Sequence, residues 1–200
     1  IMRIINKFFK NNGLHSFILK NLLIDNKKYK VVNDTIRENA KSSYDDAWLF
    51  MLARHNDIIF DIGSNLGQAS LLCLQNKSIK KIVLCDPNPM ALSYASMNLI
   101  HNNFSQKAIF LLNCVSDIPD KTINFYTDST SGGGSIFQNT ENFIKSKTIT
   151  LDKISNDYKI SPKLIKIDVE GAEIEVLNGA NKLAKEVKPM FLVEMHSNEF

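Results

Sequence analysis

The sequence predicts an α/β protein built on a doubly wound, mostly parallel β-sheet. Short apolar runs, rich in β-branched residues and typical of buried parallel strands, alternate with helical patterns. These runs cover residues 58–61, 81–85, 108–115, 163–167 and 190–193. Polar groups stand at or just past their ends: Asp61, Asp86, Asp117, Asp168, Glu194 and His196. Because ligands bind beyond the carboxyl ends of such strands, we expect these groups to line one site.

Length and composition narrow the class of protein. A chain of 200 residues can bury the core of one domain, and its apolar and charged fractions of 44% and 22% are ordinary for soluble proteins. The net charge of +3 argues against a dedicated nucleic-acid binder. Three cysteines in apolar contexts, without a C-x-x-C motif, suggest core residues in a reducing compartment, so we expect a cytoplasmic protein. No apolar run reaches the ~20 residues of a transmembrane helix, and no signal peptide is recognised.

The first 43 residues are predicted to form a helical extension to a main domain over residues 44–200. Apolar residues between Lys and Arg along residues 2–24 predict two short helices, divided at Asn11-Asn12-Gly13. Such a basic amphipathic segment can contact an anionic membrane or a lipid-linked substrate, although packing on the domain is the commoner outcome. A short strand is expected at residues 29–32.

The next helix is predicted at residues 44–54, directly before the first strand of the sheet. Its buried face is expected to consist of Ala47, Trp48, Met51 and Leu52.

The turn after the first strand is the segment most typical of a ligand site. It reads D-x-G-x-N-x-G, from Asp61 to Gly67, and a helical pattern follows it. Gly63 and Gly67 allow the backbone to pass close to a ligand or to its own helix. Dinucleotide-binding turns read G-x-G-x-x-G instead, and here Asn65 replaces the middle glycine. The opening acid would repel a pyrophosphate, but it suits a ligand with a cationic tail and ribose hydroxyls, such as S-adenosylmethionine. A structural role in any doubly wound sheet is the alternative.

The ends of the second and third strands supply further candidates. Asp86 ends the second strand, where an acid grips ribose hydroxyls in doubly wound sheets; a helix cap is the alternative. Pro87-Asn88-Pro89 follows and fits a turn and a first helical position. Ser116 and Asp117 close the third strand, at the edge expected to face the adenine, and an ordinary polar turn explains them almost as well.

After the third strand the simple alternation stops. Strand-like segments at residues 122–126 and 148–151 enclose a loop at residues 129–135 with three consecutive glycines. We expect a β insertion near the mouth of the site, with the loop either a mobile lid or a loose hairpin end. The fourth strand turns into a helix that is expected to end near Asn178-Gly179.

Residues 165–173, IKIDVEGAE, are the most specific motif in the chain. Together with the opening turn, the DPNP turn at residues 86–89, VSD at 115–117 and TLD at 150–152, they occur in an order that resembles the FkbM-type methyltransferase family. The resemblance covers residues 44–200 and implies a Rossmann-like sheet of the class I methyltransferase type. The family more often has Glu at the position of Asp86, a difference of one methylene that should preserve ribose binding. The chain ends before the last two strands usual in this fold, so we expect a C-terminally truncated domain.

The resemblance implies S-adenosylmethionine as the cofactor and O-methylation of a hydroxyl on a sugar, glycan or natural product. We predict cofactor contacts from the opening turn and from the ends of the later strands: Asp61, Gly63, Ser64, Asn65, Gly67, Asp86, Pro87, Asn88, Ser116, Asp117 and Asp168. Asp168, Glu170 and His196 are predicted to lie near the transferred methyl group.

A sugar hydroxyl is weakly acidic, so a base or a metal is useful for removing its proton. His196 is the best base by its ordinary pKa, and Asp168 is the hypothesised positioner of the acceptor. Asp168 or Glu170 could alternatively hold a divalent cation through oxygen ligands, although no metal ligand is assigned from the sequence.

Three rival functions remain. A methyltransferase acting on nucleic-acid bases is disfavoured, because acids at Asp168-Val169-Glu170 would repel phosphate where such enzymes carry a D/N-P-P-Y/F-like turn. A nicotinamide oxidoreductase lacks its glycine fingerprint here. A non-catalytic binding or assembly module is the third alternative. The expected partner is a small-molecule, glycan or lipid-linked sugar acceptor rather than a nucleic acid, and no oligomeric state is predicted.

Overall fold

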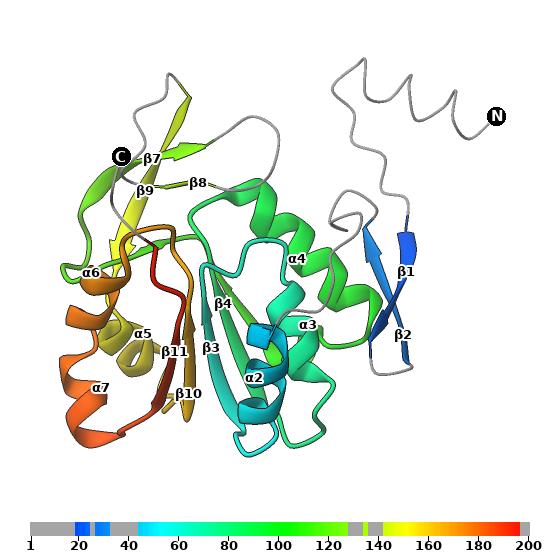
Figure 1. The fold of residues 1–200 in the computed structure, drawn as a ribbon. Coiled ribbons are helices and arrows are strands. Elements are labelled where there is room, and N and C mark those ends of the chain that lie inside the picture. The colour runs from blue at the N-terminus through cyan, green and yellow to red at the C-terminus, as the bar shows by residue number, and fades with distance from the viewer. Residues whose placement is uncertain (1–18, 25–26, 33–43, 128–133, 136–141, 197–200) are drawn as a thin grey trace. The chain divides into compact units, whose positions relative to one another are not determined.

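The computed structural model describes residues 19–24, 27–32, 44–127, 134–135 and 142–196 (Figure 1). The chain divides into two compact units, Ile1–Ala40 and Lys41–Phe200. The domain boundary expected at residue 43 stays a prediction. No helix in the described part of the chain combines the length and the apolarity that crossing a membrane requires.

The first unit contains a β-hairpin where the sequence predicted a helix. β1 (Leu19–Ile24) pairs antiparallel with β2 (Lys27–Val32). Buried Tyr29 and Val31 flank the exposed Lys30, the period of two that characterises a strand. The strand expected at residues 29–32 is therefore confirmed, and the helix expected over residues 2–24 is wrong for 19–24, which serve as its partner. Residues 2–18 lie outside the described part, and membrane contact through this segment stays a prediction.

The second unit is built on a fully parallel, five-stranded sheet, which confirms the predicted fold class. Its strands occur in the spatial order β11-β10-β3-β4-β5. Their bounds are Ile58–Ile62 for β3, Lys81–Cys85 for β4, Ala108–Leu111 for β5, Leu164–Ile167 for β10 and Met190–Val193 for β11. From β3 the chain first builds outward through β4 and β5, and then returns to add β10 and β11 on the other side. The strand order thus reverses between β3 and β10, the place where doubly wound sheets bind ligands.

Helices cover both faces of this sheet (Figure 1). Three precede the second sheet in the chain: α2 (Tyr44–Ala53), α3 (Gln68–Leu74) and α4 (Pro89–His101), the last followed by a 3₁₀ turn at Ser105–Lys107. Three come after it: α5 (Leu151–Tyr158), α6 (Glu173–Asn178) and α7 (Asn181–Glu186). The sequence analysis did not anticipate α5 or α7, and residue 151, expected in a strand, begins α5.

The buried face predicted for α2 is wrong. Trp48 and Met51 are 63% and 50% exposed, whereas Leu49 and Ala53 are buried. These two residues lie four positions apart and therefore share one face of the helix. Apolar residues surround nearly all of α2, so its sequence period does not select one side.

A second, four-stranded sheet confirms the predicted β insertion. Its order is β6-β9-β7-β8, and its strands are β6 (Cys114–Val115), β7 (Thr122–Thr127), β8 (Gly134–Ser135) and β9 (Phe143–Ile149). The single strand expected at residues 108–115 is in fact two, because β5 ends at Leu111 and β6 joins the second sheet. Figure 1 shows β7, β8 and β9 on the side of the carboxyl ends of the central strands. The glycine loop before β8 lies outside the described residues.

The core lies between the central sheet and its helices. Phe60, Val83 and Ile165 of the sheet pack in one buried cluster with Ile154 of α5 and Leu183 of α7. All three cysteines, Cys73, Cys85 and Cys114, are buried and free, as the sequence indicated.

One carboxylate fastens α5 to α7. The Oδ2 and Oδ1 atoms of Asp152 accept hydrogen bonds from the backbone N–H groups of Lys182 and Leu183, at 2.9 and 2.8 Å. Asp152 therefore caps the start of α7 from a neighbouring helix, since no side chain at the start of α7 itself does so.

We expect Asp152→Ala to lower the free energy of unfolding by about 1–2 kcal/mol, the usual loss for a helix cap. Urea titration followed by far-UV circular dichroism measures it. Asp157→Ala, which removes an exposed carboxylate from the same helix, is the matched control. Equal losses in the two variants would contradict the capping role.

Candidate active site

The turn after β3 lies against its neighbours in the fold, and its glycines are needed for that contact. Gly63 has a φ of 73°, and a Cβ there would stand 1.8 Å from the carbonyl oxygen of Asp168. Gly67 has a φ of 77°, and its Cβ would stand 2.9 Å from that of Ala95. The turn after β3 thus lies close to the end of β10 at Gly63 and close to α4 at Gly67.

Asp86 joins the two loops that follow β3 and β4. Its Oδ2 accepts a hydrogen bond from the Asn65 N–H and its Oδ1 accepts one from the Asn88 N–H, both at 2.8 Å. The helix cap is Asn88, whose side-chain oxygen accepts from the N–H groups of Met90 and Ala91, so the capping alternative for Asp86 is wrong. Burial raises the pKa of Asp86 to about 6, against the opposing effect of its two backbone hydrogen bonds.

Pro87 and Pro89 flank the cap residue. Pro89 occupies the first turn of α4, as predicted for a proline at this position.

Polar atoms in the turn after β3 fit a polar ligand. Ser64 Oγ and Asn65 Oδ1 are buried and have no hydrogen-bond partner in the described structure. An unpaired buried polar group costs about 1–3 kcal/mol, so such groups usually mark a missing partner. S-adenosylmethionine carries an amine, a carboxylate and ribose hydroxyls, and so offers both hydrogen-bond donors and acceptors.

Asp61 is tied to the protein more strongly than its sequence position indicated. It lies within β3 and is 2% exposed, and its Oδ2 accepts a hydrogen bond of 2.6 Å from Ser70 Oγ. Its Oδ1 faces the ammonium group of Lys166, at 3.5 Å, from the adjacent position on β10. The same ammonium group lies 3.1 Å from Asp168 Oδ2 and donates to the Gly63 carbonyl at 3.3 Å.

Lys166 therefore holds β3, β10 and the turn together, and sequence reasoning missed it. The available signal was a lysine in the middle of an otherwise apolar, buried strand. Burial opposes the charge of Lys166, but the carboxylates of Asp61 and Asp168 outweigh it and raise the lysine pKa.

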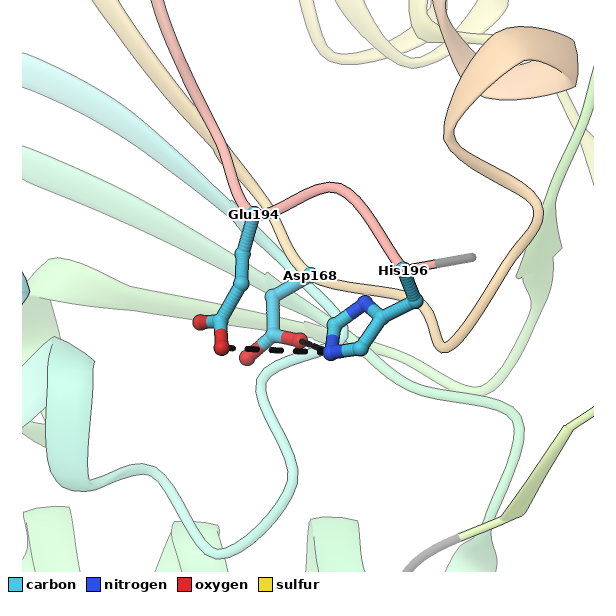
Figure 2. A group of neighbouring side chains, drawn as sticks. All are labelled: Asp168, Glu194 and His196. Atoms are coloured by element: carbon cyan, nitrogen blue, oxygen red, sulfur yellow. Dashed lines mark ion pairs between the residues drawn. The ribbon is translucent and has the colours of Figure 1, made fainter. Parts of the chain in front are cut away.

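His196 lies among acids just past the end of β11. Its Nδ1 is 3.1 Å from Glu173 Oε1, within hydrogen-bond distance. Its Nε2 lies 3.9 Å from Asp168 Oδ1, 3.6 Å from Glu170 Oε2 and 3.8 Å from Glu194 Oε1. Figure 2 shows Asp168, Glu194 and His196 directed toward one another. The three residues predicted to lie near the methyl group, Asp168, Glu170 and His196, are thus neighbours.

Glu173 is the functional candidate that the sequence analysis did not single out. It is 1% exposed, although it occupies the first turn of α6, and Oε1 also accepts from the Gly171 N–H at 3.0 Å. Burial opposes ionisation of Glu173, but these hydrogen bonds outweigh it and lower the carboxyl pKa. Burial likewise opposes protonation of His196, while the Glu173 hydrogen bond and the surrounding carboxylates raise its pKa.

Ser116 and Asp117 directly follow β6 of the second sheet. Ser116 donates its N–H to the carbonyl of Ile149 in β9 and its hydroxyl to Asp117 Oδ1. The Ser116 carbonyl lies against Gly179, where a Cβ would come within 2.3 Å of it. No hydrogen bond within the described residues joins this pair to the turn after β3, and its adenine contact stays a prediction.

The arrangement defines a class of protein. A parallel sheet with this strand order, an acid-opened glycine turn after its first strand and a second acid after the next strand belongs to the Rossmann-like methyltransferases. The model of the FkbM methyltransferase domain matches residues 61–200, and the chain belongs to this family.

Individual relatives are more distant. The hexuronic acid methyltransferase AglP of Haloferax volcanii is 25% identical over 146 residues, which make up 72% of this chain and 58% of that protein. The chain thus spans a little over half the length of this curated relative.

Two solved structures resemble the fold. The methyltransferase FkbM of Methylobacillus flagellatus is 20% identical, with a TM-score of 0.49 over 68% of this chain and 32% of that one. An O-methyltransferase of Bacillus cereus, in complex with SAH, is 13% identical, with a TM-score of 0.45 over 74% of this chain and 55% of that one. At TM-scores below 0.5, neither likeness bears on the function.

We expect Lys166→Met to lower the free energy of unfolding by about 3–5 kcal/mol, because Asp61 would remain as an unpaired buried charge. Urea titration at neutral pH measures the loss. Lys182→Met is the control, since its side chain is exposed and its ion pair is 3.9 Å long. The double variant Asp61→Asn/Lys166→Met should recover part of the stability. A loss below about 1 kcal/mol would show that the pair is not a structural necessity.

Proposed function

We propose that this protein is an S-adenosylmethionine-dependent methyltransferase that methylates a hydroxyl oxygen of a sugar, glycan or natural product. The observation that carries the proposal is the meeting of His196 with several carboxylates beside the strand-order reversal of an FkbM-family sheet. Asp168, one of these carboxylates, lies against Gly63 in the turn whose unpaired polar atoms fit the cofactor.

The residues after β3 and β4 would hold the cofactor. The turn from Gly63 to Gly67 would lie against the cofactor, and Ser64 Oγ and Asn65 Oδ1 are its unpaired side-chain oxygen atoms. Asp86 can accept ribose hydroxyls on the lone pairs that its two backbone hydrogen bonds leave available. When bound, the cofactor supplies an electrophilic methyl group, which forms a C–O bond to the acceptor as the C–S bond breaks and its electron pair passes to sulfur.

The cluster around His196 would orient the acceptor and remove its proton. Fixing the acceptor oxygen in line with the methyl group contributes several kcal/mol by positioning alone. Asp168 is held by Lys166, so one of its oxygen atoms is fixed and the other faces His196. The acceptor hydroxyl group can donate a hydrogen bond to Asp168, and its proton can then pass to a basic group of this cluster.

Hexuronic acids are the first acceptors to test, because the curated relative AglP is named for methylating one. A hexuronic acid carries both hydroxyl groups and a carboxylate. The acids around His196 would repel an acceptor carboxylate, which favours a neutral hydroxyl there.

Mass spectrometry of hexuronic acid glycosides, neutral glycosides and lipid-linked sugars, incubated with protein and S-adenosylmethionine, tests the proposal. A gain of one methyl group that survives mild alkali indicates an ether and supports it. A gain that alkali removes indicates an ester, and would overturn the choice of a hydroxyl. Absence of cofactor binding in calorimetry would favour the non-catalytic alternative, and methylation of RNA or DNA would contradict the expected partner class.

The affinity for S-adenosylmethionine should fall below about pH 6, because Asp86 is protonated there and a neutral carboxyl group accepts fewer hydroxyl hydrogen bonds. One proton must then be lost on binding, so the dissociation constant should rise by up to about tenfold per pH unit. Calorimetric titrations between about pH 5 and 8 measure it. Asp86→Asn should bind weakly at every pH. An unchanged affinity of the natural sequence over this range would exclude Asp86 from the ribose site.

His196→Ala should reduce turnover by about 10²–10⁴-fold, the usual contribution of a group that assists proton transfer. Cofactor affinity should change much less than turnover, because His196 follows β11 whereas most of the predicted cofactor residues lie in the turns after β3 and β4. The control is His55→Ala, which removes an exposed histidine. Turnover near that of the natural sequence, with the cofactor bound normally, would remove His196 from the mechanism.

A further inference from the structure

We propose that Asp168, Glu194 and His196 form a binding site for a divalent metal ion. Asp168 follows β10, and Glu194 and His196 follow β11, the adjacent strand of the sheet. One ligand atom from each residue can be chosen so that all three lie within 4.8 Å of one another, and Figure 2 shows them converging. The chemical role of the ion rests on the proposed methyl transfer, whereas the binding of the ion does not.

The distances within this trio suit a shared cation better than direct contact. His196 Nε2 lies 3.9 Å from Asp168 Oδ1 and 3.8 Å from Glu194 Oε1, beyond hydrogen-bond length. Bonds of about 2.0–2.2 Å to one cation place its ligand atoms roughly 3–4 Å apart. The three atoms therefore need only small movements to coordinate one ion.

The histidine is oriented by a buried group outside the trio. Glu173 is 1% exposed and its Oε1 lies 3.1 Å from His196 Nδ1, so this carboxylate can accept a hydrogen bond from the Nδ1–H group and leave Nε2 directed at the other carboxylates. Metal-bound histidines commonly donate their second ring N–H to a carboxylate in this way. A histidine acting only as a charge partner for surface acids does not need a buried acceptor on its far side.

Asp168 is oriented in a similar manner. Lys166 binds Asp168 Oδ2 at 3.1 Å, which leaves Oδ1 on the side of His196. Two of the three proposed ligands thus have their second polar atom fixed by a buried partner, and Glu194 supplies a more exposed third.

The local charge also favours a cation. Four carboxylates, from Asp168, Glu170, Glu173 and Glu194, surround the His196 ring within 4 Å. Lys166 forms an ion pair with Asp168 and shares its ammonium group with Asp61. A divalent ion would offset negative charge on these acids. Two carboxylates with one imidazole nitrogen suit a transition-metal ion such as Mn²⁺ better than Mg²⁺, which prefers oxygen ligands.

The ion would change the role of His196 from base to ligand. A cation at this position lowers the pKa of an acceptor hydroxyl group that reaches it. Glu170 Oε2, 3.6 Å from His196 Nε2, is then placed to take the hydroxyl proton and pass it to solvent.

Titration of the whole chain with Mn²⁺, without cofactor or acceptor, tests the site, and electron paramagnetic resonance reports the free ion. We expect one saturable ion per chain. Glu194→Gln and His196→Ala should each weaken binding at least tenfold, and Glu173→Gln about 10–100-fold through loss of the histidine orientation. Glu186→Gln, which alters an exposed acid on α7, should bind like the natural sequence.

No saturable binding up to millimolar Mn²⁺, or equal binding by Glu194→Gln and the natural sequence in folded samples, would overturn the site. The outcome is separable from the proposed function. Methyl transfer that persists in excess chelator refutes the metal role and preserves the methyltransferase. Saturable Mn²⁺ binding without methylation of any acceptor retains the site and refutes the function.

Discussion

The whole arrangement depends on how β3 and β10 meet. They are far apart in the sequence, yet adjacent in register, so Asp61 and Lys166 stand side by side in the interior of the sheet. Their side chains are only 2% and 13% exposed, so the loss of either group would leave the other as an uncompensated charge. The Lys166 ammonium group extends this dependence to Asp168 and to the Gly63 carbonyl. A single cation thereby links the ends of the two strands between which the strand order reverses.

Asp86 performs the corresponding task between β3 and β4. Because both of its oxygen atoms accept backbone N–H groups, the two loops beside the proposed cofactor site keep a fixed separation. Asp86 can therefore hold the loops and accept hydrogen bonds from a ligand at the same time, since each carboxylate oxygen has a second lone pair. The burial that accompanies these loop contacts also raises the pKa of Asp86 to about 6.

The sequence predicted the sheet well because buried parallel strands leave an unambiguous pattern of apolar, β-branched residues. The prediction was less accurate where the same residues fit more than one secondary structure or more than one buried face. α2 is apolar on nearly every side, so its exposed Trp48 was assigned to the core. The strand β1 reads equally well as a helix until its partner β2 is known.

The candidate site could be predicted only in part for a related reason. Acids at strand ends are visible in the sequence because the architecture places them at one edge. Lys166 and Glu173 are different, since each is a charged residue inside a strand or a helix whose burial depends on a partner from another element. Such residues become recognisable only when the register of the strands and the path of the C-terminal segment are known.

Gly179 connects the second sheet to the rest of the domain in an unusual way. Its φ is an ordinary −76°, yet a side chain would collide with the Ser116 carbonyl, so the glycine serves proximity rather than backbone freedom. The β6–β9 portion of the insertion is therefore anchored to the α6–α7 corner, while β7 and β8 build outward from it. The sequence of that outer portion can therefore change without loss of this contact, provided that the anchoring corner keeps a residue without a side chain.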